Sequence, residues 1–295
     1  MKKDKLEKLP RKRKKVGLAL GGGGAKGLAH IGVIKALEEA GIPIDFIAGT
    51  SMGALIGGWY AMDKNIAFLE NLFLKVGQQD GFRPEKMMKS RGQILFQDKS
   101  ILEFLNLGFG RKEMEYCEIP FRAIATNVED GGEEILKEGS LAQAVEASIA
   151  TPLIFSPVKI GEKIMMDGGF SNPVPADLAR AMGADVVLAV DVSSHWINLP
   201  QNLSSSKNMY TAILSSFSAV EYQIAKHILP EADLIVRPAV THYSFLDFPR
   251  AREIIDAGYR ETKKNLNALR EKIGWVKLPP GTLGEALTRL FSTEV

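Results

Sequence analysis

The chain has 295 residues, 45% of them hydrophobic, and a net charge of only +2 at neutral pH. It contains no run of 18 uninterrupted apolar residues, which argues against a membrane-spanning helix. The single cysteine, Cys117, excludes an internal disulfide. Cys and His residues never occur at metal-ligand spacing, so we expect no structural metal site. We also expect no cofactor and no nucleic-acid partner.

The positive charge is concentrated at the N-terminus. Residues 1–15 hold nine Lys or Arg against two acidic residues, a net charge of +7, which leaves about −5 for the rest of the chain. Such a block is typical of a solvated, disordered tail, and it would also be attracted to anionic lipid headgroups. We therefore expect a tail over 1–15 and a single domain over 16–295 in a cytoplasmic protein. Contact of the tail with the inner membrane surface is the functional alternative.

Strand-like and helix-like segments alternate along the chain. The apolar run 16–20 predicts a buried strand, and apolar residues at spacing three predict a helix over 25–40. This alternation predicts an α/β fold with a mainly parallel central sheet, helices on both faces, and a helical C-terminal part over about 205–295. Further strands are expected at 42–49, 121–128, 133–139, 158–167 (a hairpin turning at Gly161), 185–192 and 232–239, and further helices at 52–62, 141–150, 174–184, 208–228 and, twice, after Pro249.

Four consecutive glycines, Gly21 to Gly24, separate the first strand from the first helix in "GLALGGGGAKGLAH". Gly22, Gly24 and Gly27 match a dinucleotide fingerprint, but the second strand ends in "FIAGTSMG", without the acidic residue that binds the ribose. An NTPase phosphate loop would need Ser or Thr after Lys26, where Gly27 stands. The remaining interpretation is an oxyanion hole built from backbone N–H groups.

The next strand is followed by a candidate nucleophile. Residues 49–53, Gly-Thr-Ser-Met-Gly, form a G-x-S-x-G motif between a strand and a helix, which is the setting of a nucleophile elbow. Gly49 and Gly53 would relieve crowding in the sharp turn, Ser51 would be the nucleophile, and the N–H of Met52 would be an oxyanion donor. The candidate base is Asp167, which ends an apolar strand and precedes Gly168 and Gly169. An ordinary Asp-Gly turn is the structural alternative.

Four motifs, "GGGGAKG", "GTSMGA", "ASIATPLIFSPV" and "DGG", occur in the order found in the patatin-like phospholipases. Over residues 16–192 the chain resembles this family, and most closely its bacterial members that are similar to the esterase domain of neuropathy target esterase. The resemblance implies a three-layer α/β/α fold and a Ser–Asp dyad without histidine. It also implies hydrolysis of the acyl esters of phospholipids or lysophospholipids, without a metal.

The resemblance assigns roles by position. Ser51 is the nucleophile and Asp167 the general base. In the segment 147–158, Pro152 and Phe155 are expected to shape the acyl pocket. The family usually has Arg where this chain has Lys26, and no functional residue is assigned beyond about residue 200. Gly22, Gly23, Gly24 and Met52 are expected to form the oxyanion hole, with Gly27, Gly49, Gly53, Gly168 and Gly169 as supporting glycines.

Two other functions remain open at this point. One is a Ser-His-Asp esterase, in which Ser51 pairs with Asp167 or Asp191 and with His195, His227 or His242, whereas His30 is expected to face no motif. The other is a nucleotide-binding regulator that uses the glycine loop without catalysis.

The segment 63–112 is the last unassigned feature. It is rich in Phe and includes the pair Met87 and Met88. We interpret it as a lid or acyl-chain groove, with ordinary core packing as an equal alternative.

Overall fold

The computed structural model describes residues 13–78, 98–193 and 206–274. These residues contain one mixed sheet with the strand order β5-β6-β3-β2-β1-β7-β8, and β4 pairs with β3 outside this path. Strands β1, β2, β3, β7 and β8 run parallel to one another. Strands β4 and β6 pair antiparallel with β3, and β5 pairs antiparallel with β6. The expected mainly parallel sheet is therefore confirmed. The strands are β1 (Val16–Leu20), β2 (Phe46–Thr50), β3 (Phe121–Asn127), β4 (Glu133–Leu136), β5 (Val158–Ile160), β6 (Lys163–Asp167), β7 (Val186–Val190) and β8 (Leu234–Val236).

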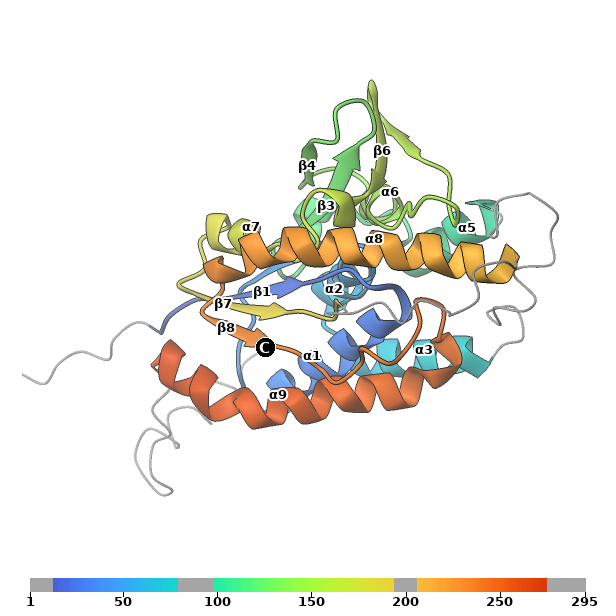
Figure 1. Ribbon diagram of the computed structural model, residues 1–295. Coiled ribbons are helices and arrows are strands. Elements are labelled where there is room, and N and C mark those ends of the chain that lie inside the picture. The colour runs from blue at the N-terminus through green and yellow to red at the C-terminus, as the bar shows by residue number, and fades with distance from the viewer. Residues whose placement is uncertain (1–12, 79–97, 194–205, 275–295) are drawn as a thin grey trace, which may run out of the picture.

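Helices cover both faces of this sheet, which gives the three layers (Figure 1). Alternate residues of β1 serve the two faces: Leu18 and Leu20 enter the larger core, while Ala19 faces the smaller one. The larger core is formed with α1 (Ala29–Glu39), α2 (Met52–Asp63), α3 (Ile66–Gln78), α5 (Asp98–Phe109), α6 (Leu141–Ser148) and α9 (Ala251–Ile273), and the smaller core with α7 (Ala176–Ala181) and α8 (Ser206–Ile228).

The first helix differs from the expected one. Residues Gly24–Leu28 form a 3-10 turn, η1, and the α-helix begins only at Ala29. The N–H of Ala25 donates to the carbonyl of Phe245, outside the helix, which fixes this turn against the C-terminal part of the chain. After Pro249 the structure has α9, and the second expected helix lies outside the described residues.

Part of the expected tail belongs to the folded domain. Arg13 forms two hydrogen bonds of 2.6 Å to Asp45, and the backbone N–H of Lys15 donates to Asp185. Asp45 also accepts from the N–H of Val16, so these contacts fix the entry into β1. The boundary at residue 15 was therefore too late by at least three residues, and residues 1–12 lie outside the described part. In the described ranges no helix is long and apolar enough to cross a bilayer.

Candidate active site

The register of β3 brings Ser51 and Asp167 together. Strand β2 ends with Thr50 opposite Ile124, and β6 ends with Asp167 opposite the next β3 residue, Ala125. The residue that follows β2 therefore meets the last residue of β6. The Ser51 hydroxyl donates to Oδ2 of Asp167 at 2.8 Å, although the two residues are 116 positions apart in the sequence.

Ser51 sits on a strained turn between β2 and α2. Its φ is 53° and its ψ −121°, a conformation that non-glycine residues rarely adopt and that costs roughly 1–3 kcal/mol. The turn is tight: a Cβ on Gly53 would lie 2.0 Å from the Leu20 carbonyl oxygen, and one on Gly49 would lie 2.6 Å from that of Gly53. The Ser148 hydroxyl accepts from the Ser51 N–H at 2.9 Å and helps to hold the turn.

Asp167 is buried and fully engaged. Its Oδ2 accepts from the hydroxyls of Ser51 and Thr151, and its Oδ1 accepts from the N–H of Gly169 at 2.9 Å. Burial raises the pKa of Asp167, and these hydrogen bonds, with that from Thr151 the largest, oppose the rise. Gly168 is required beside it, because a Cβ there would lie 2.3 Å from the Ile124 carbonyl oxygen. Ser51 and Asp167 thus form a buried, hydrogen-bonded pair.

The glycine loop lies beside Ser51, but its N–H groups are not equivalent. The N–H of Gly22 donates to the Pro173 carbonyl at 2.9 Å, so Gly22 is a spacer next to Ser51 and not an oxyanion donor, contrary to expectation. In the described part of the chain, no acceptor is paired with the N–H of Gly23, Gly24 or Met52. Gly24 has a φ of 57°, and a Cβ there would lie 2.5 Å from the Phe245 carbonyl oxygen. Three N–H groups remain for an oxyanion.

Two residues behind the loop hold it in place. A Cβ on Gly27 would lie 2.4 Å from Cγ of Met52, so this glycine lets the two halves of the site pack. His30, which we expected to face no motif, contacts the glycine loop: its Nε2 donates to the Gly21 carbonyl at 2.7 Å. Burial lowers the pKa of His30 to about 4, so its ring is neutral at physiological pH and acts as a fixed hydrogen-bond donor.

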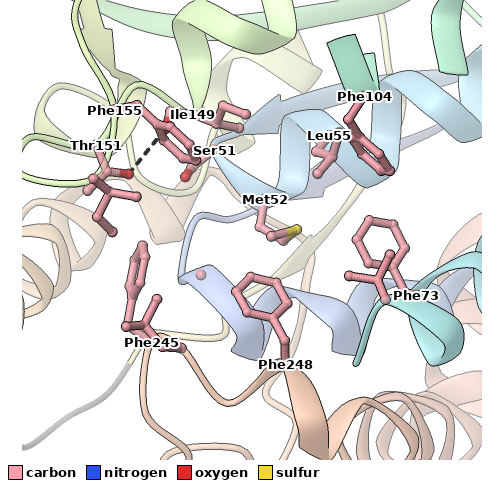
Figure 2. Close-up of a pocket in the computed structure, with 14 residues that line it drawn as sticks. Ser51, Met52, Leu55, Phe73, Phe104, Ile149, Thr151, Phe155, Phe245 and Phe248 are labelled. Carbon is pink, nitrogen blue, oxygen red and sulfur yellow. Dashed lines mark hydrogen bonds between the residues drawn. The ribbon is translucent and has the colours of Figure 1, made fainter. Parts of the chain in front are cut away.

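An apolar cavity of about 220 Å³ opens at Ser51. Figure 2 shows Ser51, Thr151 and Phe155 on one side of Met52 and Phe73 and Phe104 on the other, so the cavity runs away from the nucleophile. None of its lining residues carries a charge. The lining comes from the glycine loop and α2 (Gly24, Ser51, Met52, Leu55), α3 and α5 (Phe73, Val76, Phe104), the segment after α6 (Ile149, Thr151, Ile154, Phe155) and the segment before α9 (Phe245, Leu246, Phe248).

This lining revises three expectations. Phe155 lines the cavity as expected, whereas Pro152 does not. The segment 63–112 serves both of its alternatives, since α3 and α5 line the cavity while their Leu69 and Phe109 enter the core. Met87 and Met88 lie outside the described residues. The C-terminal third, to which we assigned no functional residue, contributes three residues; its only sequence signal is the aromatic pair in "SFLDFP".

The structure describes two of the three histidines of the alternative triad, His227 and His242, and neither is hydrogen-bonded to Ser51 or Asp167. Within the described ranges, neither Ser51 nor Asp167 has a histidine among its hydrogen-bond partners. His227 and His242 are exposed, and His195 lies outside the described residues. Asp191 is engaged elsewhere, with Ser193 and Arg237. The described residues contain no group of three or more Cys, His, Asp or Glu arranged to hold a metal ion.

The comparisons with known proteins agree with the motifs. A family model for patatin-like phospholipases matches residues 18–180. The chain is 31% identical over 295 residues to lysophospholipase nte1 of Aspergillus fumigatus and 32% identical over 289 residues to lysophospholipase NTE1 of Coccidioides immitis. These alignments cover 90% and 88% of this chain but only 19% and 18% of the relatives, so the chain spans about a fifth of their length.

Among solved structures, VipD from Legionella pneumophila aligns with 87% of this chain and 67% of its own, at 17% identity and a TM-score of 0.47. The family model, in contrast, covers more than half of the 295 residues and includes the glycine loop, the elbow and Asp167. The chain therefore belongs to the patatin-like phospholipase family.

Proposed function

We propose that this chain is a serine acyl hydrolase that cleaves fatty-acyl esters of lysophospholipids or phospholipids through a Ser51–Asp167 dyad. The observation that carries the proposal is the 2.8 Å hydrogen bond to a buried carboxylate from Ser51, which lines an uncharged apolar cavity. Family membership and the name of the similar fungal proteins, lysophospholipase, support the substrate class.

In the first half of the reaction, Asp167 accepts the Ser51 proton as Oγ attacks the ester carbonyl. Negative charge then develops on the carbonyl oxygen, where the N–H groups of Gly23, Gly24 and Met52 donate to it. One such donor contributes about 10²–10³ in rate in other hydrolases. Asp167 returns the proton to the leaving alcohol, and an acyl-enzyme forms on Ser51.

In the second half, a water molecule attacks the acyl-enzyme and Asp167 acts as base again, which releases the fatty acid. A carboxylate is a weak base beside an imidazole. The burial that raises the pKa of Asp167 therefore favours the reaction, because it makes the ionised form a better proton acceptor.

The cavity supports one acyl chain at a time. Its volume of about 220 Å³ is below the ~300–1,000 Å³ of sites that enclose a drug-sized ligand. An uncharged lining favours the acyl chain over the headgroup, which would remain outside. We infer that a lysophospholipid, with a single chain, satisfies this site, and that the basic N-terminal residues favour an anionic surface.

The decisive experiment measures fatty-acid release and fluorophosphonate labelling in Ser51→Ala and Asp167→Asn. Each single change should reduce kcat by at least ~10³, and the double variant should lose little more, because the two residues act as one unit. Near-native turnover by folded Asp167→Asn would exclude the dyad.

The competing Ser-His-Asp mechanism makes a different prediction. Gln variants of His195, His227 and His242 should keep most of their activity, since a catalytic histidine would contribute ~10² or more. His30→Gln is not a clean test, because His30 holds the glycine loop. A folded His195→Gln variant without activity and with poor labelling at Ser51 would replace the dyad by the triad.

A further inference from the structure

Two buried charges lie behind the dyad and take no part in the mechanism above. Glu221 on α8 is 8% exposed, Lys26 on η1 is 4% exposed, and Asp167 between them in sequence is 2% exposed. Charged side chains are almost never this buried unless they are paired or functional. These groups also act on one another, so three elements far apart in the chain place two carboxylates and an ammonium group in one buried region.

Gly169 shows how close the two carboxylates are. A Cβ placed on Gly169 would lie 2.4 Å from Oε1 of Glu221 and 3.3 Å from Oδ1 of Asp167, so both oxygens face the same side of this glycine. They are therefore within the ~4–6 Å range in which one carboxylate affects the proton affinity of another. Any side chain at 169 would displace Glu221, which is a physical reason for the second glycine of "DGG".

Lys26 provides the balancing charge. Both Glu221 and Asp191 attract its ammonium group, although burial lowers the pKa of Lys26 overall. Asp191 is itself held by Arg237 at 3.1 Å and by Ser193. The charged groups that act on Glu221 are thus Asp167 on β6 and Lys26 on η1, and they act in opposite directions.

We propose that Glu221 is a positioning residue for the dyad: its ionised form strengthens Asp167 as a base, and Lys26 favours that ionised form of Glu221. The proposal rests on the proposed function, because it requires Asp167 to be the base. It extends the site into α8, beyond the 18–180 range of the family match.

The charge of Glu221 changes in the physiological range. Burial and the neighbouring Asp167 raise the pKa of Glu221 to about 7, and Lys26 opposes this rise. As the pH increases through this value, Glu221 becomes negative and Asp167 binds a proton more strongly. Proton removal from Ser51 then becomes faster. The two carboxyls titrate as a pair, so the rate should rise in two steps, with the upper step near pH 7.

The test is the pH dependence of fluorophosphonate labelling at Ser51, and of kcat/KM for a soluble short-chain ester, from about pH 5 to 9. In the unmodified chain we expect an upper step of about threefold, from roughly one unit of added basicity at a Brønsted slope near one half. Glu221→Gln should lack this step and remain at the lower rate. Lys26→Met should move its midpoint upward by about one unit, because the opposing charge is lost.

The matched control is Glu271→Gln, an exposed glutamate at the end of α9, which should keep the upper step. Glu221→Asp keeps the charge and should also retain it, which separates a charge effect from a packing effect. An upper step that persists in Glu221→Gln, or a downward shift in Lys26→Met, would overturn the proposal.

If Glu221→Gln does not fold, the direction of the Lys26→Met shift alone decides. These outcomes are separate from the proposed function. Labelling that persists in Ser51→Ala would overturn the hydrolase itself, whereas an inactive Ser51→Ala with an unchanged Glu221→Gln profile would overturn only the role of Glu221.

Discussion

Thr151→Val tests how the base is tuned, because it removes one hydroxyl from the site and keeps the side-chain shape. Thr151 is buried and donates to Oδ2 of Asp167, the same oxygen that accepts from Ser51. This hydrogen bond stabilises the ionised carboxylate and lowers the pKa of Asp167 against the effect of burial. Its loss should therefore raise the pKa of Asp167 and make it a stronger base.

The magnitude follows from the kind of bond. A hydrogen bond to a charged group contributes ~1.5–3 kcal/mol, and 1.36 kcal/mol corresponds to one pKa unit. Because the proposed mechanism uses Asp167 in its ionised form, activity should fall as the pH drops through its pKa. We expect the acid limb of the Thr151→Val profile to move upward by about one to two pH units. The plateau rate should be maintained or increased.

The assay is kcat/KM for a soluble short-chain ester as a function of pH, with fluorophosphonate labelling at Ser51 as a second readout. Thr151→Ser is the matched control, since it restores the hydroxyl and should restore the limb. The reasoning would be refuted by a folded Thr151→Val enzyme whose acid limb is unchanged or moves downward.

Three further predictions follow from the same structure. Asp167→Asn should be more stable than the unmodified chain at neutral pH. Folding raises the pKa of Asp167, so ionisation of this carboxyl destabilises the folded protein as the pH rises. Thermal unfolding should show a higher Tm for the variant at neutral pH, and the two Tm values should converge below about pH 4. Phe104→Ala should extend the cavity and shift the preference toward longer acyl chains, by up to ~0.8 kcal/mol or fourfold in kcat/KM for each additional methylene buried. Leu107→Ala, at an exposed position of the same helix, should leave the preference unchanged. Equal chain-length profiles for the two variants would contradict this prediction. Residues 1–12 carry a net charge of +4 and precede the Arg13–Asp45 contact. Their deletion should weaken binding to anionic vesicles at low salt and leave the turnover of soluble esters unchanged. Equal vesicle binding by both proteins would exclude a role for this charge.

The elements that the sequence predicted well are those whose pattern is local. The alternation of apolar strands and periodic helices identified the α/β fold with its mainly parallel sheet, because each element buries one face according to its own repeat. The elbow around Ser51 was recognisable for the same reason. Its tight turn requires Gly49 and Gly53 within two residues of the serine, so five consecutive residues are enough to identify it.

The tertiary structure decided what depends on contacts between distant segments. The availability of the glycine N–H groups is one example. The N–H of Gly22 donates to the Pro173 carbonyl and is therefore not available to an oxyanion. The cavity wall from Phe245 to Phe248, the loop contact of His30 and the approach of Glu221 to Gly169 have no sequence pattern of their own. A sequence motif reflects the steric requirements of its own turn. The hydrogen-bond partners and the burial of its residues depend instead on the distant segments that the sheet register places next to it.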